Sequence, residues 1–247
     1  MNLARDLSRA LRPGWVMHDA GLDPDPWQTQ LLVSEEPRHL LLCSRQSGKS
    51  TTVASKAVET AIFDPGLILM IAPAQRQSGE LFRKAKDIYL ALDDVPRIVQ
   101  ESARSMELAN GSRIVALPGT EATIRGYSAP KLVLVDEAAR VEDALYHSIT
   151  PMLAVSRGRL IALTTPYGRR GWFYEAWEHG GDYWQRTKIS AHDCPRIDAE
   201  WLKAERESVG DWAFRQEYLV EFVDTDEQFF SSALIEAAID PDLEPIW

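Results

Sequence analysis

The chain has 247 residues, of which 45% are hydrophobic and 9% aromatic, so it can bury the core of one large domain with a small appendage. Its formal charge of -10 argues against nucleic-acid binding over the whole surface, because nonspecific affinity for duplexes comes mainly from lysine and arginine. Two cysteines, Cys43 and Cys194, imply no disulfide framework. Neither a signal-peptide core nor an apolar run of membrane-spanning length is found, so we expect a protein that is neither exported nor anchored.

The predicted elements alternate between strands and helices. In chain order we expect a helical lead-in over 1–38, a strand near 39–43, a helix over about 49–62, a strand over 67–72, a helix over roughly 76–92, a hairpin over 104–117, and strands over 132–135 and 158–163. Asn110-Gly111 predicts a type I′ turn in the hairpin. The alternation predicts an α/β fold with a mostly parallel sheet covered by helices.

The segment Cys43–Ser50, Cys-Ser-Arg-Gln-Ser-Gly-Lys-Ser, joins a buried strand to the start of a helix. Backbone N–H groups of such a loop point into one concavity, where the positive end of the helix dipole favours polyphosphate. We expect Lys49 to reach the β- and γ-phosphates and the Ser50 hydroxyl to bind Mg²⁺. Cys43 replaces the first glycine of the pattern G-x-x-x-x-G-K-[ST], and an exposed helix start is the alternative. The candidate nucleotide-binding residues of the loop are Ser44, Gln46, Ser47, Gly48, Lys49, Ser50 and Thr51.

A second candidate site segment covers residues 131–139, Lys-Leu-Val-Leu-Val-Asp-Glu-Ala-Ala. It predicts a strand that is buried on both faces and ends in two adjacent carboxylates. Because successive strand residues project to opposite faces, Asp136 can face a metal ion while Glu137 turns toward an attacking water. Phosphoryl transfer needs both roles, whereas the alternative is a solvated strand end.

Thr164 and Thr165 follow the strand predicted over 158–163. Like the phosphate loop and the two acids, they lie at a strand carboxyl end, where ligands of parallel sheets gather. We interpret their hydroxyls as groups that sense the γ-phosphate, and a plain strand-to-turn exit is the alternative.

Several short segments occur in a characteristic order along the chain. They are Pro26-Trp27-Gln28, Ser44–Ser50, Ile71-Ala72-Pro73, Ile124-Arg125-Gly126, Val135–Ala139, Thr164-Thr165-Pro166 and Phe214–Tyr218. Their combination, from about residue 24 to 230, resembles the ATPase domain of the large terminase subunit of tailed bacteriophages. The resemblance implies a P-loop NTPase fold of the ASCE/RecA-like type, with a mostly parallel central sheet flanked by helices and a small C-terminal lid subdomain.

The resemblance also implies a division of the chain. We expect an ATPase core with its helical lead-in over 1–170, a lid over 171–225, and the start of a linker over 226–247. Family members usually continue into a nuclease domain. Because residues 226–247 are expected to form only the start of the linker to that domain, nuclease activity is not expected in this chain.

The resemblance assigns roles that agree with those argued from the residues. It makes Lys49 and Ser50 the phosphate and Mg²⁺ ligands, Asp136 the acid associated with Mg²⁺, and Glu137 the catalytic base. Thr164 and Thr165 match the motif that couples hydrolysis to movement.

Further roles rest on the resemblance alone. Gln28 matches the glutamine that reads the adenine edge, with Trp27 as a wall of the base pocket or, alternatively, as a core residue. Arg125 matches an arginine finger that reaches into a neighbouring subunit, although an exposed arginine without function is the alternative. Arg45, inside the phosphate loop, is a second candidate for phosphate sensing.

The implied activity is Mg²⁺-dependent ATP hydrolysis that drives double-stranded DNA into a procapsid in the host cytoplasm. The implied partners are double-stranded DNA, the portal protein and the small terminase subunit, with a pentameric ring on the portal and a monomer when isolated. Two alternatives stay open: a helicase-like DNA-stimulated ATPase, and a nucleotide-gated assembly module with weak hydrolysis. No metal site beyond Mg²⁺ is expected, because the histidines lack ligand spacing.

Overall fold

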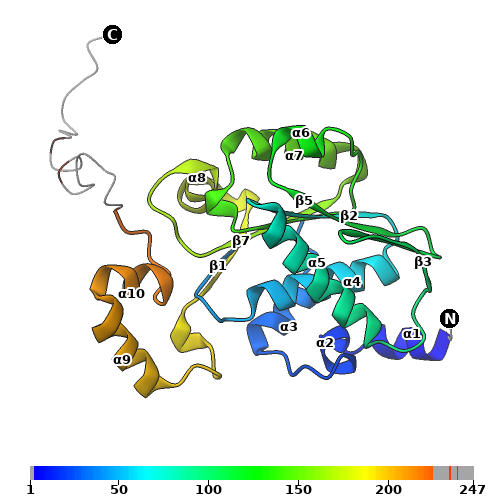
Figure 1. The fold of residues 1–247 in the computed structure, drawn as a ribbon, viewed down its shortest axis with the longest axis horizontal. Coiled ribbons are helices and arrows are strands. Elements are labelled where there is room, and N and C mark those ends of the chain that lie inside the picture. Colours follow the sequence, from blue (N-terminus) through cyan, green and yellow to red (C-terminus); the bar gives the residue numbers. More distant parts are fainter. Residues whose placement is uncertain (1–2, 225–233, 235–237, 239–247) are drawn as a thin grey trace, which may run out of the picture.

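The computed structural model describes residues 3–224, 234 and 238, and Figure 1 shows a central sheet with helices on both faces. The helices are α1 Leu3–Ala10, α2 Trp15–Asp19, α3 Pro26–Val33, α4 Lys49–Phe63, α5 Gln75–Leu90, α6 Glu121–Ile124, α7 Asp143–Ser156, α8 Gly171–His179, α9 Ala199–Val209 and α10 Asp211–Glu217. The strands are β1 Arg38–Cys43, β2 Leu67–Ala72, β3 Ile98–Glu101, β4 Ser105–Leu108, β5 Arg113–Pro118, β6 Leu132–Asp136, β7 Arg159–Thr164 and β8 Gln185–Ile189. The α/β architecture expected from the sequence is confirmed.

The strand order of the sheet is β3-β4-β5-β2-β6-β7-β1-β8. In this order, all neighbours from β5 onward pair in parallel. At the other edge, β3 pairs antiparallel with β4, and β4 pairs antiparallel with β5. The carboxyl ends of the parallel strands therefore share one edge of the sheet. Because β7 separates β1 from β6, the segments that follow β1 and β6 face each other across a gap one strand wide.

The strands of the sheet centre are buried on both faces. Along β1, Leu41 belongs to the core cluster with Val53 of α4, whereas Leu40 and Leu42 belong to the cluster with Leu145 of α7. Figure 1 shows the corresponding layers, with α3, α4 and α5 on one face and α6, α7 and α8 on the other. Side chains that alternate between two apolar layers explain why these strands read as continuous hydrophobic runs.

The predicted boundary between core and lid, at residue 170, cuts through the sheet. Strand β8 pairs in parallel with β1, from His39 opposite Gln185 to Cys43 opposite Ile189, so the core continues to residue 189. Helices α9 and α10 pack around a separate small cluster that includes Leu202 and Phe214. Figure 1 shows these two helices beside the sheet rather than over it. The predicted linker, 226–247, lies outside the described residues apart from residues 234 and 238.

The hairpin of β4 and β5 is present, but its turn differs from the prediction. A type I′ turn needs positive φ at both central residues, whereas Gly111 has a φ of 87° and Asn110 is absent from the residues with positive φ. The Gly111 N–H donates to the Leu108 carbonyl, and the Leu108 N–H donates to Ser112. These bonds describe a three-residue loop with glycine in the left-handed position. Asn110 instead donates through its side chain to the Ala61 carbonyl, and this contact ties the loop to α4.

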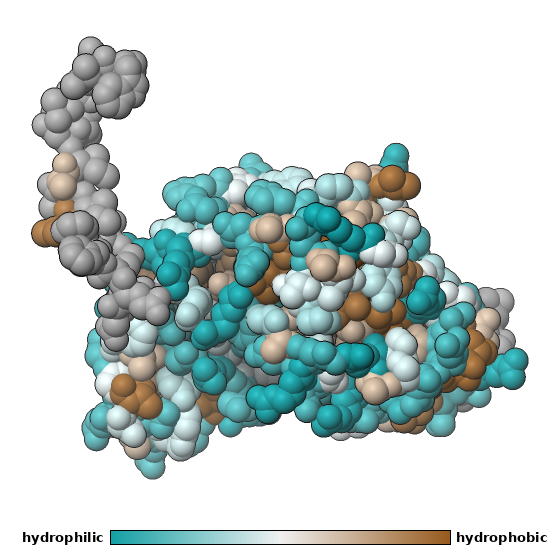
Figure 2. Space-filling view, turned by 45° about the horizontal axis from the view of Figure 1, so that its top comes forward, coloured by the Kyte–Doolittle hydropathy of each residue, from teal (hydrophilic) through white to brown (hydrophobic). Residues whose placement is uncertain are grey.

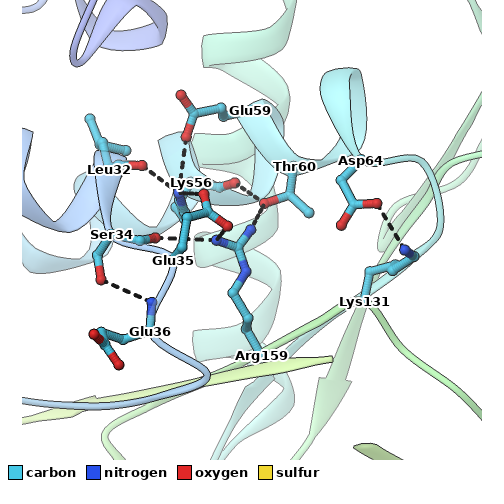
Figure 3. Close-up of polar contacts among 10 residues, drawn as sticks. All are labelled: Leu32, Ser34, Glu35, Glu36, Lys56, Glu59, Thr60, Asp64, Lys131 and Arg159. Atoms are coloured by element: carbon cyan, nitrogen blue, oxygen red, sulfur yellow. Dashed lines mark hydrogen bonds and ion pairs between the residues drawn. The ribbon is translucent and has the colours of Figure 1, made fainter. Parts of the chain in front are cut away.

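A polar network joins α3, α4 and β7 at the sheet edge opposite the phosphate loop (Figure 3). The Lys56 ammonium, 2% exposed, donates to the Leu32 carbonyl and to Glu59, while Arg159 donates to the Ser34 carbonyl and to Thr60. A buried ammonium is tolerated only when its donors are satisfied. The bonds of Lys56 and Arg159 also join α4 to α3 and to the start of β7. Burial lowers the pKa of Lys56 and raises that of Glu59.

Figure 2 shows a face of mostly hydrophilic side chains, with hydrophobic ones in small separate areas. Among the helices in the described part of the chain, none is long and apolar enough to cross a membrane.

Lowering the pH should destabilise the fold through His39. This residue is 5% exposed, and its Nε2 lies 2.7 Å from the Thr187 hydroxyl oxygen of β8. Burial lowers the pKa of the His39 imidazole from 6.5 to about 4. Between about pH 6.5 and pH 4, the unfolded state therefore binds a proton at this residue that the folded state does not bind. At ~1.4 kcal/mol per pKa unit, the wild type should lose about 2 kcal/mol more than His39→Gln between roughly pH 7.5 and pH 5. Urea unfolding of both proteins measures this difference.

The exposed His179 supplies the control, since His179→Gln should lose stability with pH as the wild type does. If the free energy of unfolding changes equally with pH in the wild type and in His39→Gln, then His39 binds its proton equally well in the folded and unfolded states, which contradicts the prediction.

Candidate active site

The phosphate loop is shaped by its own hydrogen bonds and by two residues with positive φ. Gln46 has a φ of 60° and Gly48 a φ of 89°, and the Ser47 hydroxyl donates to the Ser44 carbonyl at 2.9 Å. The positive φ of Gly48 favours glycine, and a Cβ there would lie 2.6 Å from Gln28 Nε2, so the end of that side chain would have to shift. Cys43 is fully buried beneath the loop, and burial raises the pKa of its thiol to about 12. It is thus an inert small side chain at the position of the missing glycine.

The two acids after β6 lie opposite the start of α4. The Ser50 hydroxyl donates to Asp136 Oδ2 at 3.3 Å, and Lys49 Nζ lies 3.1 Å from Glu137 Oε1. Burial raises the pKa of Asp136, the charge of Glu137 adds to this rise, and Lys49 opposes it. The lysine, the hydroxyl and both carboxylates therefore form one constellation.

Glu137 has an unusual backbone conformation. Its φ of 50° is left-handed, which is uncommon for a residue other than glycine, and its N–H donates to Asp136 Oδ1 at 2.9 Å. A single 3-10 turn, Ala138–Arg140, follows directly. The abrupt turn ends the strand and leaves the Glu137 side chain 22% exposed.

A cleft of about 650 Å³ joins these parts. Its lining residues are Arg45, Gln46, Ser47, Gly48, Lys49, Ser50, Thr51, Gln77, Lys84, Glu137, Arg140 and Thr165. Gln77, Lys84 and Arg140 line the cleft although no motif in the sequence predicts them as site residues. Gln77 lies five residues after the end of β2, and Arg140 lies three residues after Glu137, so proximity to a strand carboxyl end was the available signal.

The donor set at Ser50 and Asp136 fits Mg²⁺. Both supply hard oxygen ligands that already lie side by side. Mg²⁺ usually keeps several waters and takes one or two protein ligands together with substrate phosphates. No group of three or more His, Cys, Asp or Glu side chains that could hold another metal ion occurs within the described residues.

Several predicted residues do not line the cleft. Gln28 accepts from the Asp25 N–H at 2.8 Å and reaches the Ser47 carbonyl at 3.5 Å, which places its amide behind the loop. Trp27 is 7% exposed and belongs to the hydrophobic core. The Arg125 side chain is 70% exposed and pairs with Glu121 on α6.

The two threonines differ in their surroundings. Thr165 lines the cleft, whereas the buried Thr164 hydroxyl donates to the Thr165 carbonyl at 2.7 Å and lies 3.4 Å from the Ala139 nitrogen. Thr164 is thus in contact with the turn that follows Glu137.

The phosphate loop is also tied to the C-terminal part of the chain. The Arg45 N–H donates to the Glu217 carbonyl at 3.1 Å, and its guanidinium pairs with the Glu217 carboxylate at the end of α10. Arg196 donates to Asp25 at 2.6 Å and to the Ser47 carbonyl at 3.1 Å. No sequence pattern predicts the Arg196 contacts, because they join segments far apart in the chain.

Known proteins resemble this chain in sequence and fold. It is 28% identical over 248 residues to the terminase large subunit of Thermus phage G20c, an alignment that covers 85% of this chain and 51% of that protein. The chain thus spans about half the length of this relative.

Solved structures agree on the fold. The large terminase ATPase domain of Thermus phage P74-26 has a TM-score of 0.74 and 23% identity, covering 86% of this chain and 99% of that one. The large terminase of the thermophilic bacteriophage D6E in complex with ADP has a TM-score of 0.67 and 14% identity, covering 81% of this chain and 54% of that one. The expected P-loop NTPase fold is confirmed by these likenesses.

The family described as terminase large subunit, T4-like-virus type, N-terminal, matches residues 40–237. This range includes the phosphate loop, both acids and the two threonines. The chain therefore belongs to the family of terminase large subunits and corresponds to its N-terminal part.

Proposed function

We propose that the chain hydrolyses ATP and is the motor domain of a DNA-packaging terminase. The observation that carries this proposal is the pairing of Lys49 with Glu137 and of Ser50 with Asp136 across one cleft. A phosphate-binding lysine, an oxygen donor set and a carboxylate able to receive a proton are the groups that phosphoryl transfer to water requires.

In the proposed reaction, the nucleotide phosphates occupy the loop, and the Lys49 ammonium pairs with their oxygens instead of with the Glu137 carboxylate. Glu137 then accepts a proton from the attacking water, whose oxygen bonds to the γ-phosphorus. The bond from that phosphorus to the β–γ bridging oxygen breaks, and its electron pair stays with ADP. Ser50 and Asp136 would hold Mg²⁺, which supplies charge neutralisation at the phosphates when bound.

Secondary roles complete the proposed site. Arg125 is proposed as the finger that acts on a neighbouring subunit, since its guanidinium is exposed and lies outside its own cleft. Arg45 is proposed as a phosphate sensor, because it lines the cleft while paired with Glu217. Gln28 and Trp27 are proposed to border the adenine pocket behind the loop.

The proposed work of the motor is translocation of double-stranded DNA into a procapsid, on a portal-bound pentameric ring and with the small terminase subunit, in the host cytoplasm. Family membership and the likeness to large terminase domains support this assignment. Helices α9 and α10 are the proposed lid, since they pack in their own cluster and contact the phosphate loop through Glu217. Thr164 and Thr165 are proposed to couple hydrolysis to movement.

Lys49→Ala should weaken ATP binding. The substitution removes the ammonium that would contact the phosphates, so we expect affinity to fall at least about tenfold, or ~1.4 kcal/mol, by calorimetry. Lys131→Ala is the matched control, because Lys131 pairs with Asp64 at the opposite sheet edge. Equal affinity of the wild type and Lys49→Ala would remove this lysine from the site.

Glu137→Gln should abolish most turnover. An amide cannot accept the proton of the attacking water, so we expect kcat to fall ~100-fold or more, measured as phosphate release with and without linear duplex DNA. Glu36→Gln, at an exposed position, should leave kcat unchanged. A wild-type chain that binds ATP but turns it over no faster than Glu137→Gln would favour the nucleotide-gated assembly module.

Arg125→Ala should spare nucleotide binding and slow hydrolysis, on the order of 10³-fold where subunits are assembled. Mixing Arg125→Ala with Glu137→Ala should restore part of the activity, because each subunit supplies the group that the other lacks. Arg113→Ala, an exposed arginine paired with Glu107, is the control. Absence of rescue in mixed assemblies would indicate that Arg125 acts within one chain or not at all.

A further inference from the structure

Arg140 lies beside the acid end of the cleft. It ends the turn that follows Glu137, and its N–H donates to the Glu137 carbonyl at 2.9 Å. Its Nε lies 4.0 Å from Glu137 Oε2, while Lys49 Nζ lies 3.1 Å from Oε1 of the same carboxylate. Glu137 is therefore flanked by two cations, one on each oxygen.

The two cations differ in what else holds them. Lys49 is on the phosphate loop, where a bound nucleotide offers it phosphate oxygens. The Arg140 guanidinium instead lies 4.1 Å from the ring centroid of Tyr167, within cation–π distance. A planar guanidinium stacked on a ring is fixed in orientation more firmly than a flexible ammonium. Arg140 thus has an anchor that does not depend on the nucleotide.

Tyr167 connects this anchor to the segment after β7. It follows Thr165 by two residues, and the Thr164 hydroxyl lies 3.4 Å from the Ala139 nitrogen, within the turn that ends at Arg140. The acid and the threonine segment therefore meet at two points, one through the turn and one through the guanidinium.

We propose that Arg140, held by Tyr167, is a positioning residue that keeps the Glu137 carboxylate aimed into the cleft after Lys49 has turned to the phosphates. The inference rests on the proposed ATPase function. Glu137 needs such a restraint, because a misplacement of about 1 Å can cost a reaction ~100-fold. The left-handed backbone of Glu137, with a φ of 50°, sets the direction in which its side chain leaves the main chain. Arg140 then restrains the position of the carboxylate.

The test compares steady-state kinetics of the full chain and its variants. Arg140→Gln should lower kcat about tenfold while KM for ATP stays within about twofold, since the residue acts on Glu137 rather than on the nucleotide. Tyr167→Leu should reproduce that loss, whereas Tyr167→Phe keeps the ring and should retain wild-type kcat. Arg38→Gln is the matched control, because Arg38 also lies over a tyrosine, Tyr183, but at the opposite sheet edge.

A double-mutant cycle separates positioning from a structural role. In the Glu137→Gln background, Arg140→Gln should lower the residual rate less than twofold, because the group it positions is already gone. An additive loss, a rise in KM that accounts for the effect, or unchanged kcat in Arg140→Gln would each overturn the inference. Failure of the wild type to hydrolyse ATP would overturn the proposed function and this inference together, whereas an active wild type with a fully active Arg140→Gln overturns the inference alone.

Discussion

The ion pair between Lys49 and Glu137 is the interaction on which the rest of the site depends. The two side chains are only 12% and 22% exposed, so each has lost much of its hydration and needs the other's charge at 3.1 Å. Within the described residues, the other ion pair of Glu137 is the longer contact with Arg140 Nε, at 4.0 Å. The site is thus preorganised around a charge that a phosphate can take over, because phosphate oxygens satisfy the lysine in the same way as the carboxylate does.

The order of the strands makes this pair possible. Adjacent strands lie ~4.8 Å apart, so with β7 between them the ends of β1 and β6 are separated by about 10 Å. The side chains of Lys49 and Glu137 span this separation, since Lys49 Nζ lies 3.1 Å from Glu137 Oε1. The intervening strand β7 ends at Thr164, which is buried, and the next residue, Thr165, lines the cleft between the two halves of the site.

The parts of the fold that the sequence predicts are those with a local signal. Strands buried on both faces appear as short apolar runs, and the expected bounds of β1, β2, β6 and β7 agree with the structure to within a residue. Strand β8 escapes prediction because it is a polar edge strand, Gln-Arg-Thr-Lys-Ile. Helix α7 escapes it because Pro151 lies inside the helix. The predicted type I′ turn is wrong because the Asn110 side chain binds the Ala61 carbonyl of α4, a tertiary contact that no local pattern reveals.

The candidate site shows the same division between local and distant signals. Lys49, Ser50, Asp136 and Glu137 follow from strand ends and spacing, and the structure brings all of them together. Lys84 lies two turns into α5, so nothing in its neighbourhood marks it as a lining residue. For Gln28, the family resemblance implies a base pocket, whereas the contact of its amide with the Ser47 carbonyl of the phosphate loop is revealed only by the fold.

The acidic composition of the chain does not conflict with a site for polyphosphate. Charges separated by more than about 8 Å are largely screened at physiological ionic strength, so the net charge of -10 matters less than the residues that line the cleft. There the cations Arg45, Lys49, Lys84 and Arg140 outnumber the single lining carboxylate, Glu137. The N-terminus of α4 adds its partial positive charge directly at Lys49. The charged side chains that line the cleft are therefore mostly positive, although the net charge of the molecule is negative.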